Sequence, residues 1–311
     1  MKLPFRSSRF PGWLALRHRG GELDAAYVER RGSRAHVALC ETYRTPGDMT
    51  SALARLRREH GWARYRCTML LGADEYQLHS FDAPKVEAQE LKSAARWRVK
   101  ELIDYPLDAA AVDILDIPAG PNARNHLVFA VSARNEVVQR HVQRYQEAGI
   151  PLAALDIPEV AQRNISALFE EKNRGLALLA FEEQGGLLTI TCGGELFLTR
   201  RIDIPLAKLI DGDTDARALL HERIALEVQR SLDHFDRQFS AITLSRFMLV
   251  PLPVETGLAE FPGANIYVRV ERAHIGSMLD CDRIPELSDP ARQGFCLQVL
   301  GAALRDEEAY P

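Results

Sequence analysis

Histidines and cysteines are the side chains best suited to chemistry, and their spacing favours structural roles. The nine histidines lack the close spacing that metal ligands show. His234 stands beside Asp233, but adjacent residues of a helix do not face each other. His141 falls on an apolar helix face, where we expect a packed core residue. The sequence therefore predicts no metal site.

The cysteines form no C-x-x-C pair, and they are Cys40, Cys67, Cys192, Cys281 and Cys296. An odd number of scattered cysteines is typical of reduced thiols in a cytosolic protein. Three of them fall in strand-like stretches, where a small apolar residue is expected. We interpret the cysteines as core residues.

Motifs of the common hydrolases and nucleotide-binding enzymes are absent. The chain contains no G-x-S-x-G, H-E-x-x-H, Walker A or G-x-G-x-x-G pattern. Its arginines do not alternate with aromatic residues as they do in nucleic-acid platforms. We therefore expect no nucleic-acid partner.

Charge is unevenly distributed along a chain of ordinary globular composition. The 311 residues are 46% hydrophobic and 26% charged, with a net charge of -4. Residues 1–70 carry a net charge of +8, and the remainder carries -12. The basic part could meet anionic lipid headgroups or an acidic partner, or it could be a solvated surface. No apolar run approaches the ~20 residues of a membrane helix, and the N-terminus lacks the pattern of a signal peptide.

Residues 128–158 show the clearest secondary-structure pattern in the chain. Val128–Val131 predict a buried strand, and the next residues predict a helix with one apolar face. Gly149 stands where a helix needs a left-handed terminator. Leu152–Leu155 predict another short strand, and Asp156 could cap the helix that follows.

The two halves of the chain show a similar order of elements. We expect strands at 13–17, 25–30 and 35–40, a helix at 48–60 and a strand at 65–71. In the second half we expect strands at 176–181, 186–192 and 195–202, a helix at about 215–237 and strands at 242–250 and 265–271. The repeated order suggests a duplication, although the halves share no visible sequence identity. Between them we expect strands at 76–82 and 111–117 and a helix at 85–103, and helices at 157–170 and 289–305 complete the chain.

Trp97 lies off the apolar stripe of the predicted helix 85–103. It either packs against another element or faces a partner. Because large aromatic side chains are highly buried on average, we expect it to pack.

Several local motifs resemble the pilus-assembly protein PilM and its relatives. They are Trp97 before "YPLD", and the segments "VFAVSARNEVV", "YQEAGIPLAALDIP" and "EVQRSLDHF". The length and the lack of a membrane segment favour the MshI-like branch, which serves mannose-sensitive haemagglutinin (MSHA) pili. The family is related to the cytoplasmic domain of GspL of type II secretion.

The resemblance implies an α/β, actin-like (FtsA/PilM-type) duplicated fold with two lobes and a small inserted α+β subdomain. It implies a first-lobe core at 12–75, the inserted subdomain at 76–155, a helix returning to the first lobe at 156–172 and the second lobe at 173–305.

In actin-like ATPases two glycine-containing hairpins hold the phosphates, and an acidic residue near the first positions magnesium. Here the first hairpin would lie at 16–23, with Gly20 and Gly21 but no preceding aspartate. Arg17 and Arg19 stand there instead. Asp24 is the nearest aspartate, and it falls inside the second strand.

The other two loops also depart from the ATPase pattern. The second hairpin, at 179–188, carries Glu182 and Glu183 before Gly185 and Gly186, and two carboxylates would repel a phosphate. The adenosine loop is represented by a stretch with Pro251 and without the family's glycines. We therefore hypothesise that nucleotide binding is lost and that the chain has no cofactor. The alternative is altered binding of ATP and magnesium, with Arg17 and Arg19 meeting the phosphates.

The resemblance further implies a scaffold of a type IV (MSHA-like) pilus or secretion inner-membrane platform. Its partner would be a PilN/MshJ-like single-pass inner-membrane protein whose cytoplasmic tail binds as an extended segment, among other platform subunits. The protein itself would be cytoplasmic and peripheral at the inner membrane. The walls of the groove would come from 85–103, 128–133 and 48–60, with Trp97, Arg98, Arg55 and Arg58 as candidate contacts. An ATPase switch of the same fold and a self-polymerising filament protein are the other hypotheses.

Overall fold

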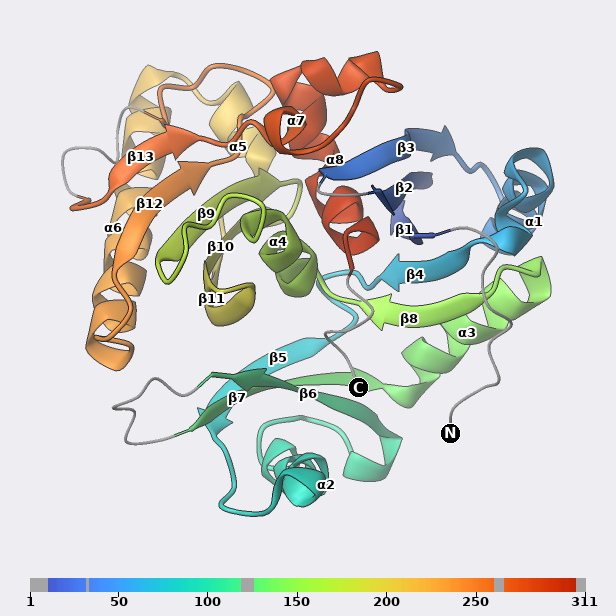
Figure 1. Ribbon diagram of the computed structural model, residues 1–311, viewed down its shortest axis with the longest axis horizontal. Helices are drawn as coiled ribbons and strands as arrows, with labels where there is room; N and C mark the ends of the chain where they lie inside the picture. The colour runs from blue at the N-terminus through green and yellow to red at the C-terminus, as the bar shows by residue number, and fades with distance from the viewer. Residues whose placement is uncertain (1–10, 32–33, 119–125, 260–265, 306–311) are drawn as a thin grey trace.

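The computed structural model describes residues 11–31, 34–118, 126–259 and 266–305. It forms two lobes side by side, with a smaller unit beneath them (Figure 1). Each lobe is built on one five-stranded sheet, and the smaller unit has a sheet of three strands.

The first lobe opens with three antiparallel strands, β1 (Trp13–Arg19), β2 (Glu22–Arg31) and β3 (Arg34–Arg44). Helix α1 (Met49–His60) follows, and the side chain of Asp48 caps it. Strand β4 (Arg66–Leu70) pairs parallel with β1, and β8 (Leu152–Asp156) pairs parallel with β4. The strand order is therefore β3-β2-β1-β4-β8.

The second lobe repeats this arrangement. Its strands are β9 (Gly175–Glu182), β10 (Gly185–Cys192), β11 (Glu195–Ile202), β12 (Leu244–Leu249) and β13 (Arg269–Arg272), in the order β11-β10-β9-β12-β13. The first three are antiparallel, and the last two run parallel to β9. The duplication predicted from the sequence is confirmed at the level of topology.

Helices complete the second lobe. They are α5 (Leu206–Asp211), α6 (Thr214–Gln238), α7 (Ile275–Met278) and α8 (Pro290–Ala303). Residues Ile224, Val228, Leu232 and Phe235 on one face of α6 are buried. This stripe packs the 25-residue helix against the lobe's sheet.

The inserted unit is smaller than predicted. It comprises β5 (Gln77–Asp82), α2 (Ala88–Val99), β6 (Ala110–Ile117) and β7 (Leu127–Arg134), with β7 in the middle of the sheet. The predicted end at residue 155 is wrong, because α3 (Asn135–Ala148) packs on α1 and β8 belongs to the first-lobe sheet. Gly149 ends α3 at φ +72°, as its position predicts.

Two helices cross between the lobes. Helix α4 (Pro158–Ser166) lies on the second-lobe sheet, where the Gln162 amide donates to the carbonyls of Leu178 and Leu187, both at 2.9 Å. Helix α4 also contributes Val160 to the first-lobe core, and α8 packs on β1 and β2. A Cβ at Gly301 of α8 would lie 2.1 Å from the Ala161 carbonyl oxygen, so only glycine permits this contact. Asp156 does not cap α4; it binds Arg305.

The three tryptophans have different environments. Trp13 and Trp62 are buried, whereas Trp97 on α2 is 66% exposed. The expectation that Trp97 packs is wrong, because α2 covers the inserted sheet with Ala95 and Val99 and turns Trp97 outward. Lys100 lies over the Trp97 ring, 5.7 Å from its centroid.

Trp62→Ala and Trp97→Ala should therefore differ sharply in stability. Trp62 is 1% exposed and stacks on His60, so its loss should lower the free energy of unfolding by roughly 3–5 kcal/mol. Loss of Trp97 should cost within about 0.5 kcal/mol. Urea unfolding of both variants measures this, and equal losses would contradict the placement of Trp97.

Candidate functional site

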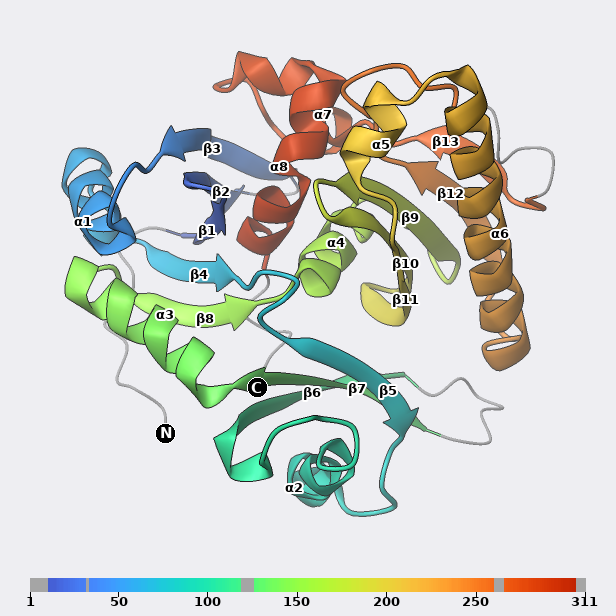
Figure 2. The ribbon, with the colours of Figure 1, turned by 180° about the vertical axis from the view of Figure 1, so that it is seen from behind.

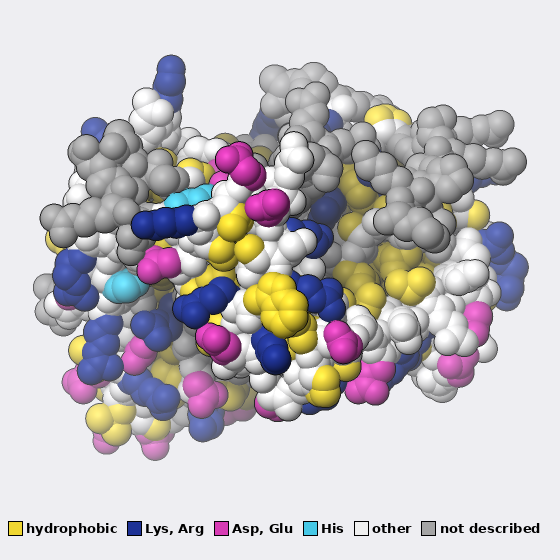
Figure 3. Space-filling view, turned by 90° about the horizontal axis from the view of Figure 1, so that it is seen from below, with side chains coloured by type: hydrophobic (Ala, Val, Ile, Leu, Met, Phe, Trp, Pro, Cys, Tyr) yellow, Lys and Arg dark blue, Asp and Glu magenta, His cyan; other side chains and the backbone are white. Residues whose placement is uncertain are grey.

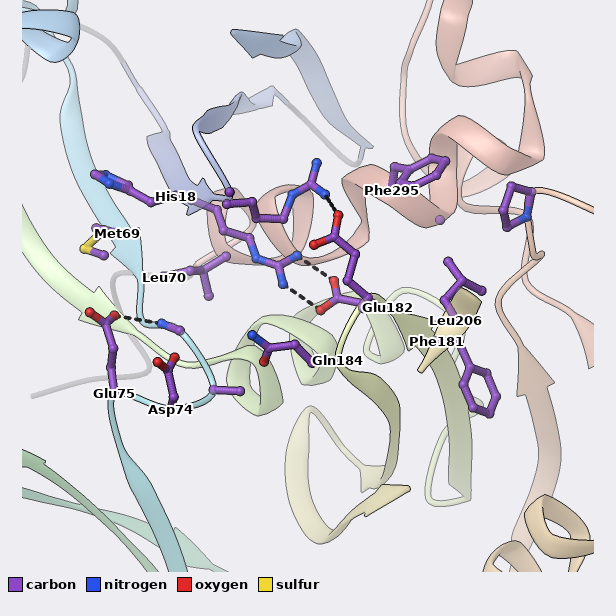
Figure 4. A pocket seen from close by; sticks show the side chains of 18 of the residues that line it. His18, Met69, Leu70, Asp74, Glu75, Phe181, Glu182, Gln184, Leu206 and Phe295 are labelled. Atoms are coloured by element: carbon purple, nitrogen blue, oxygen red, sulfur yellow. Dashed lines mark hydrogen bonds and ion pairs between the residues drawn. The ribbon is translucent and has the colours of Figure 1, made fainter. Parts of the chain in front are cut away.

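The turns of the β1–β2 and β9–β10 hairpins face each other where the lobes meet. Beside them lies a cavity of about 340 Å³, lined by residues of both lobes (Figure 4). The predicted hairpins at 16–23 and 179–188 are confirmed, and Pro251 of the third predicted loop also lines the cavity. The sequence thus located the cleft correctly.

Arg17 and Glu182 join the two hairpins directly. Nη1 and Nη2 of Arg17 donate to the two carboxylate oxygens of Glu182 at 2.6 and 2.7 Å. Both side chains are largely buried. This two-pronged geometry is the strongest form of a guanidinium–carboxylate contact, and here it spans the two lobes.

Arg19 makes a second bridge. Its guanidinium donates to Asp24 at 2.6 and 3.2 Å and to Glu183 at 2.8 Å. The bond to Asp24 raises the pKa of Arg19 above its usual range. Asp24 is buried and also accepts from the Thr42 hydroxyl at 2.7 Å. The nearest candidate for positioning magnesium is therefore engaged with Arg19.

The glycines of the two hairpins differ in what they do. Gly20 and Gly21 have positive φ angles, and an added Cβ would meet no atom within 4 Å, so they serve the turn alone. A Cβ on Gly185 would lie 2.5 Å from the Ile202 carbonyl oxygen, and one on Gly186 would lie 2.7 Å from the Phe181 ring. Packing within the second lobe explains Gly185 and Gly186.

Pro251 follows β12 at the far side of the cavity. Its carbonyl oxygen would lie 2.9 Å from a Cβ on Gly294 of α8, so the segment is pressed against that helix. Pro251 also has no N–H to offer a ligand.

A histidine cluster lines the first-lobe side of the cavity. Nε2 of His141 donates to Oε1 of Glu75 at 2.8 Å, and the Tyr145 hydroxyl lies 3.0 Å from Nε2 of His18. Burial lowers the pKa of His18 to about 4, with smaller contributions from His141 and Arg144. Burial raises the pKa of Tyr145, so its hydroxyl keeps a proton to donate to neutral His18.

The sequence predicted that His141 is buried, but not its contact with Glu75. The two residues are 66 positions apart, and no local pattern links them. Among the described residues, no group of three or more His, Cys, Asp or Glu side chains could hold a metal ion. The five cysteines form no disulfide.

A third tie holds the inserted unit to both lobes. Tyr76, at its base, donates to Glu159 of α4, and Arg201 of β11 donates to both Tyr76 and Glu159. Glu159 is fully buried. Ile117 and Phe129 of the inserted sheet also join the apolar core of the second lobe. The inserted unit is therefore anchored to both lobes.

The predicted partner groove does not form as expected. Trp97 and Arg98 lie on α2, on the lower face of the molecule, whereas Arg55 and Arg58 lie on α1 of the first lobe, well apart in Figures 1 and 2. Strand β7 is paired on both sides, so its backbone cannot accept a further strand. The space-filling view of the lower face shows apolar side chains ringed by basic and acidic ones (Figure 3).

Comparison with known proteins rests on structure. The sequence matches no protein-family model and no curated protein. A chain of the PilM-PilN type IV pilus biogenesis complex is similar over 95% of this chain and 99% of its own, with a TM-score of 0.70 and 18% identity. This chain has the actin-like fold. The cytoplasmic domain of EpsL, an inner-membrane component of the type II secretion system of Vibrio cholerae, is similar over 89% of this chain and 95% of its own, with a TM-score of 0.51 and 15% identity.

His18 should make stability depend on pH in a defined direction. Its folded pKa of about 4 lies below the unfolded value of 6.5, so between these values the unfolded chain binds the proton more readily. Stability from His18 is therefore present above pH 6.5 and is lost as pH falls through 4, by roughly 3 kcal/mol at most.

Urea unfolding of the wild type and of His18→Gln at pH 7 and pH 4.5 tests this. Glutamine does not titrate, so the stability advantage of the wild type over the variant should shrink by roughly 2 kcal/mol at pH 4.5. An advantage that is the same at both pH values would contradict the assignment.

Proposed function

We propose that this protein is a nucleotide-free scaffold of a type IV pilus or type II-like secretion platform at the inner membrane. It binds the cytoplasmic tail of a PilN-like single-pass membrane protein. The observation that carries this proposal is the likeness of nearly the whole chain to a chain of the PilM-PilN complex. The similarity to the EpsL cytoplasmic domain supports the same kind of machine. Assignment to the MSHA branch stays a prediction from the sequence.

Strand β8 is the best candidate for the tail site. Within the described residues β8 pairs only with β4, so its other edge has no strand partner. Its side chains Leu152, Ala153, Ala154 and Leu155 are all apolar and partly exposed. An apolar, unpaired edge is the surface to which an extended peptide adds as a further strand.

The duplicated fold supplies an internal comparison for β8. The strand in the same place of the second lobe is β13, whose sequence is Arg269-Val270-Glu271-Arg272. Charged side chains protect such an edge from pairing with other chains. Strand β8 lacks this protection and is the first-lobe strand nearest the inserted unit (Figures 1 and 2). This difference supports β8 as a binding edge.

The cleft supports a role without a nucleotide switch. Arg17 and Arg19 are already paired with carboxylates of the opposite lobe, and Asp24 is bound by Arg19. Among the described residues no helix is long and apolar enough to cross a bilayer. We infer that the partner's membrane helix holds the protein at the inner membrane, as a peripheral subunit on the cytoplasmic side.

Titration with a synthetic peptide of the PilN-like protein's cytoplasmic tail tests the tail site. The wild type should bind the peptide, and Ala153→Asp should bind it at least about tenfold more weakly, because the new carboxylate would be desolvated beneath the added strand.

Two exposed positions serve as controls. Leu219→Asp on α6 of the second lobe and Trp97→Ala on α2 should bind the peptide as the wild type does. Failure of the wild type to bind would sink the proposed function. Equal binding by wild type and Ala153→Asp would move the site away from β8.

A further inference from the structure

In the cleft, two arginines are paired with carboxylates of the chain itself. Arg17 and Arg19 are two residues apart on β1, so their side chains leave the same face of the strand. Both line the cavity, together with the turn of the β9–β10 hairpin. The partners of these guanidinium groups decide what the site can bind.

A guanidinium group binds a carboxylate and a phosphate with the same paired geometry. Glu182 offers Arg17 that geometry from the opposite lobe, at 2.6 and 2.7 Å. Glu183 reaches Arg19 at 2.8 Å. The two glutamates therefore use the donors that an external oxyanion would need.

Arg19 is fixed independently of the second lobe. Asp24 binds it from the neighbouring strand, and Thr42 binds Asp24. Removal of Glu182 and Glu183 would therefore leave Arg19 held in place, with its Nη1 donor to Glu183 free. Arg17 would lose Glu182, the carboxylate partner of its two Nη donors.

The charge balance of the cluster disfavours an external anion. Four carboxylates face two guanidinium groups, because Asp24, Glu182, Glu183 and, at 3.7 Å, Glu22 surround Arg17 and Arg19. An incoming phosphate would have to displace a carboxylate that is covalently part of the chain and thus present at high effective concentration. Without Glu182 and Glu183, Arg17 would face no carboxylate, and Arg19 would keep only Asp24 and the more distant Glu22.

We propose that Glu182 and Glu183 are built-in substitutes for an anionic ligand, which hold the two lobes together and exclude phosphate-bearing molecules from the arginine site. The proposal deepens the nucleotide-free scaffold proposed above and rests on it only in taking the cleft to be unliganded. When both carboxylates are removed, Arg17 and Arg19 form a binding site for oligophosphates.

The test is calorimetric titration of the full chain with tripolyphosphate at low salt. The wild type should give no saturable binding. Glu182→Gln/Glu183→Gln should bind at least about tenfold more tightly than the wild type. Adding Arg17→Ala to this double variant should abolish the gain, which locates the binding at the cleft.

A variant of equal net charge controls for general attraction. Glu222→Gln/Glu227→Gln on α6 changes the net charge by the same amount, and it should bind no better than the wild type. Circular dichroism and a cooperative melt establish that each variant is folded. If the double variant does not fold, the single variants Glu182→Gln and Glu183→Gln replace it, and Glu182→Gln should show the larger gain.

Folded variants that bind tripolyphosphate no better than the α6 control would overturn the proposal. So would wild-type protein that already binds as tightly as the double variant. Binding of the tail peptide is measured separately on β8. A negative result for tripolyphosphate therefore does not contradict the proposed function, and a negative result for the peptide does not contradict the role of Glu182 and Glu183.

Discussion

The ion pair between Arg17 and Glu182 joins the two lobes at the cleft. The pair bridges hairpins 165 residues apart in sequence, at 2.6 Å, and joins the two lobes beside the cavity. A partly buried pair of this geometry is costly to break on one side only, because the remaining charge would stay in a poorly hydrated place. Arg19, Glu183 and Asp24 extend the same contact. Ion pairs between side chains of the two lobes therefore hold the lobes together at the cleft.

The rest of the molecule is arranged around these joined lobes. Helices α4 and α8 each cover the sheet of the other lobe and meet at Gly301, where no side chain fits. Their apolar residues belong to one core that runs through both lobes. Tyr76, Glu159 and Arg201 add a polar tie between the inserted unit, α4 and β11. These contacts join the two lobes and the inserted unit at several points besides the pair of Arg17 and Glu182.

Local sequence patterns predicted most of the fold and located the cleft, but not its contacts. Strands, helix caps and the Gly149 terminator follow from periodicity and residue type, which act over a few residues. The pairing of Arg17 with Glu182, and of His141 with Glu75, joins distant segments and leaves no local signal. The sequence showed that the glutamates of the second hairpin would repel a phosphate, but it did not show that they pair with the arginines. Burial statistics also misplaced Trp97, since helix α2 is covered by the inserted sheet on one side only.

The central claim is that this actin-like protein works without a nucleotide. Calorimetric titration of the wild-type full chain with ATP and magnesium tests it most directly. The joined cleft predicts no saturable heat up to high micromolar ATP, because Arg17 and Arg19 are paired and Asp24 is engaged. Saturable binding that requires magnesium would contradict the account and would identify the protein as an ATP-dependent switch.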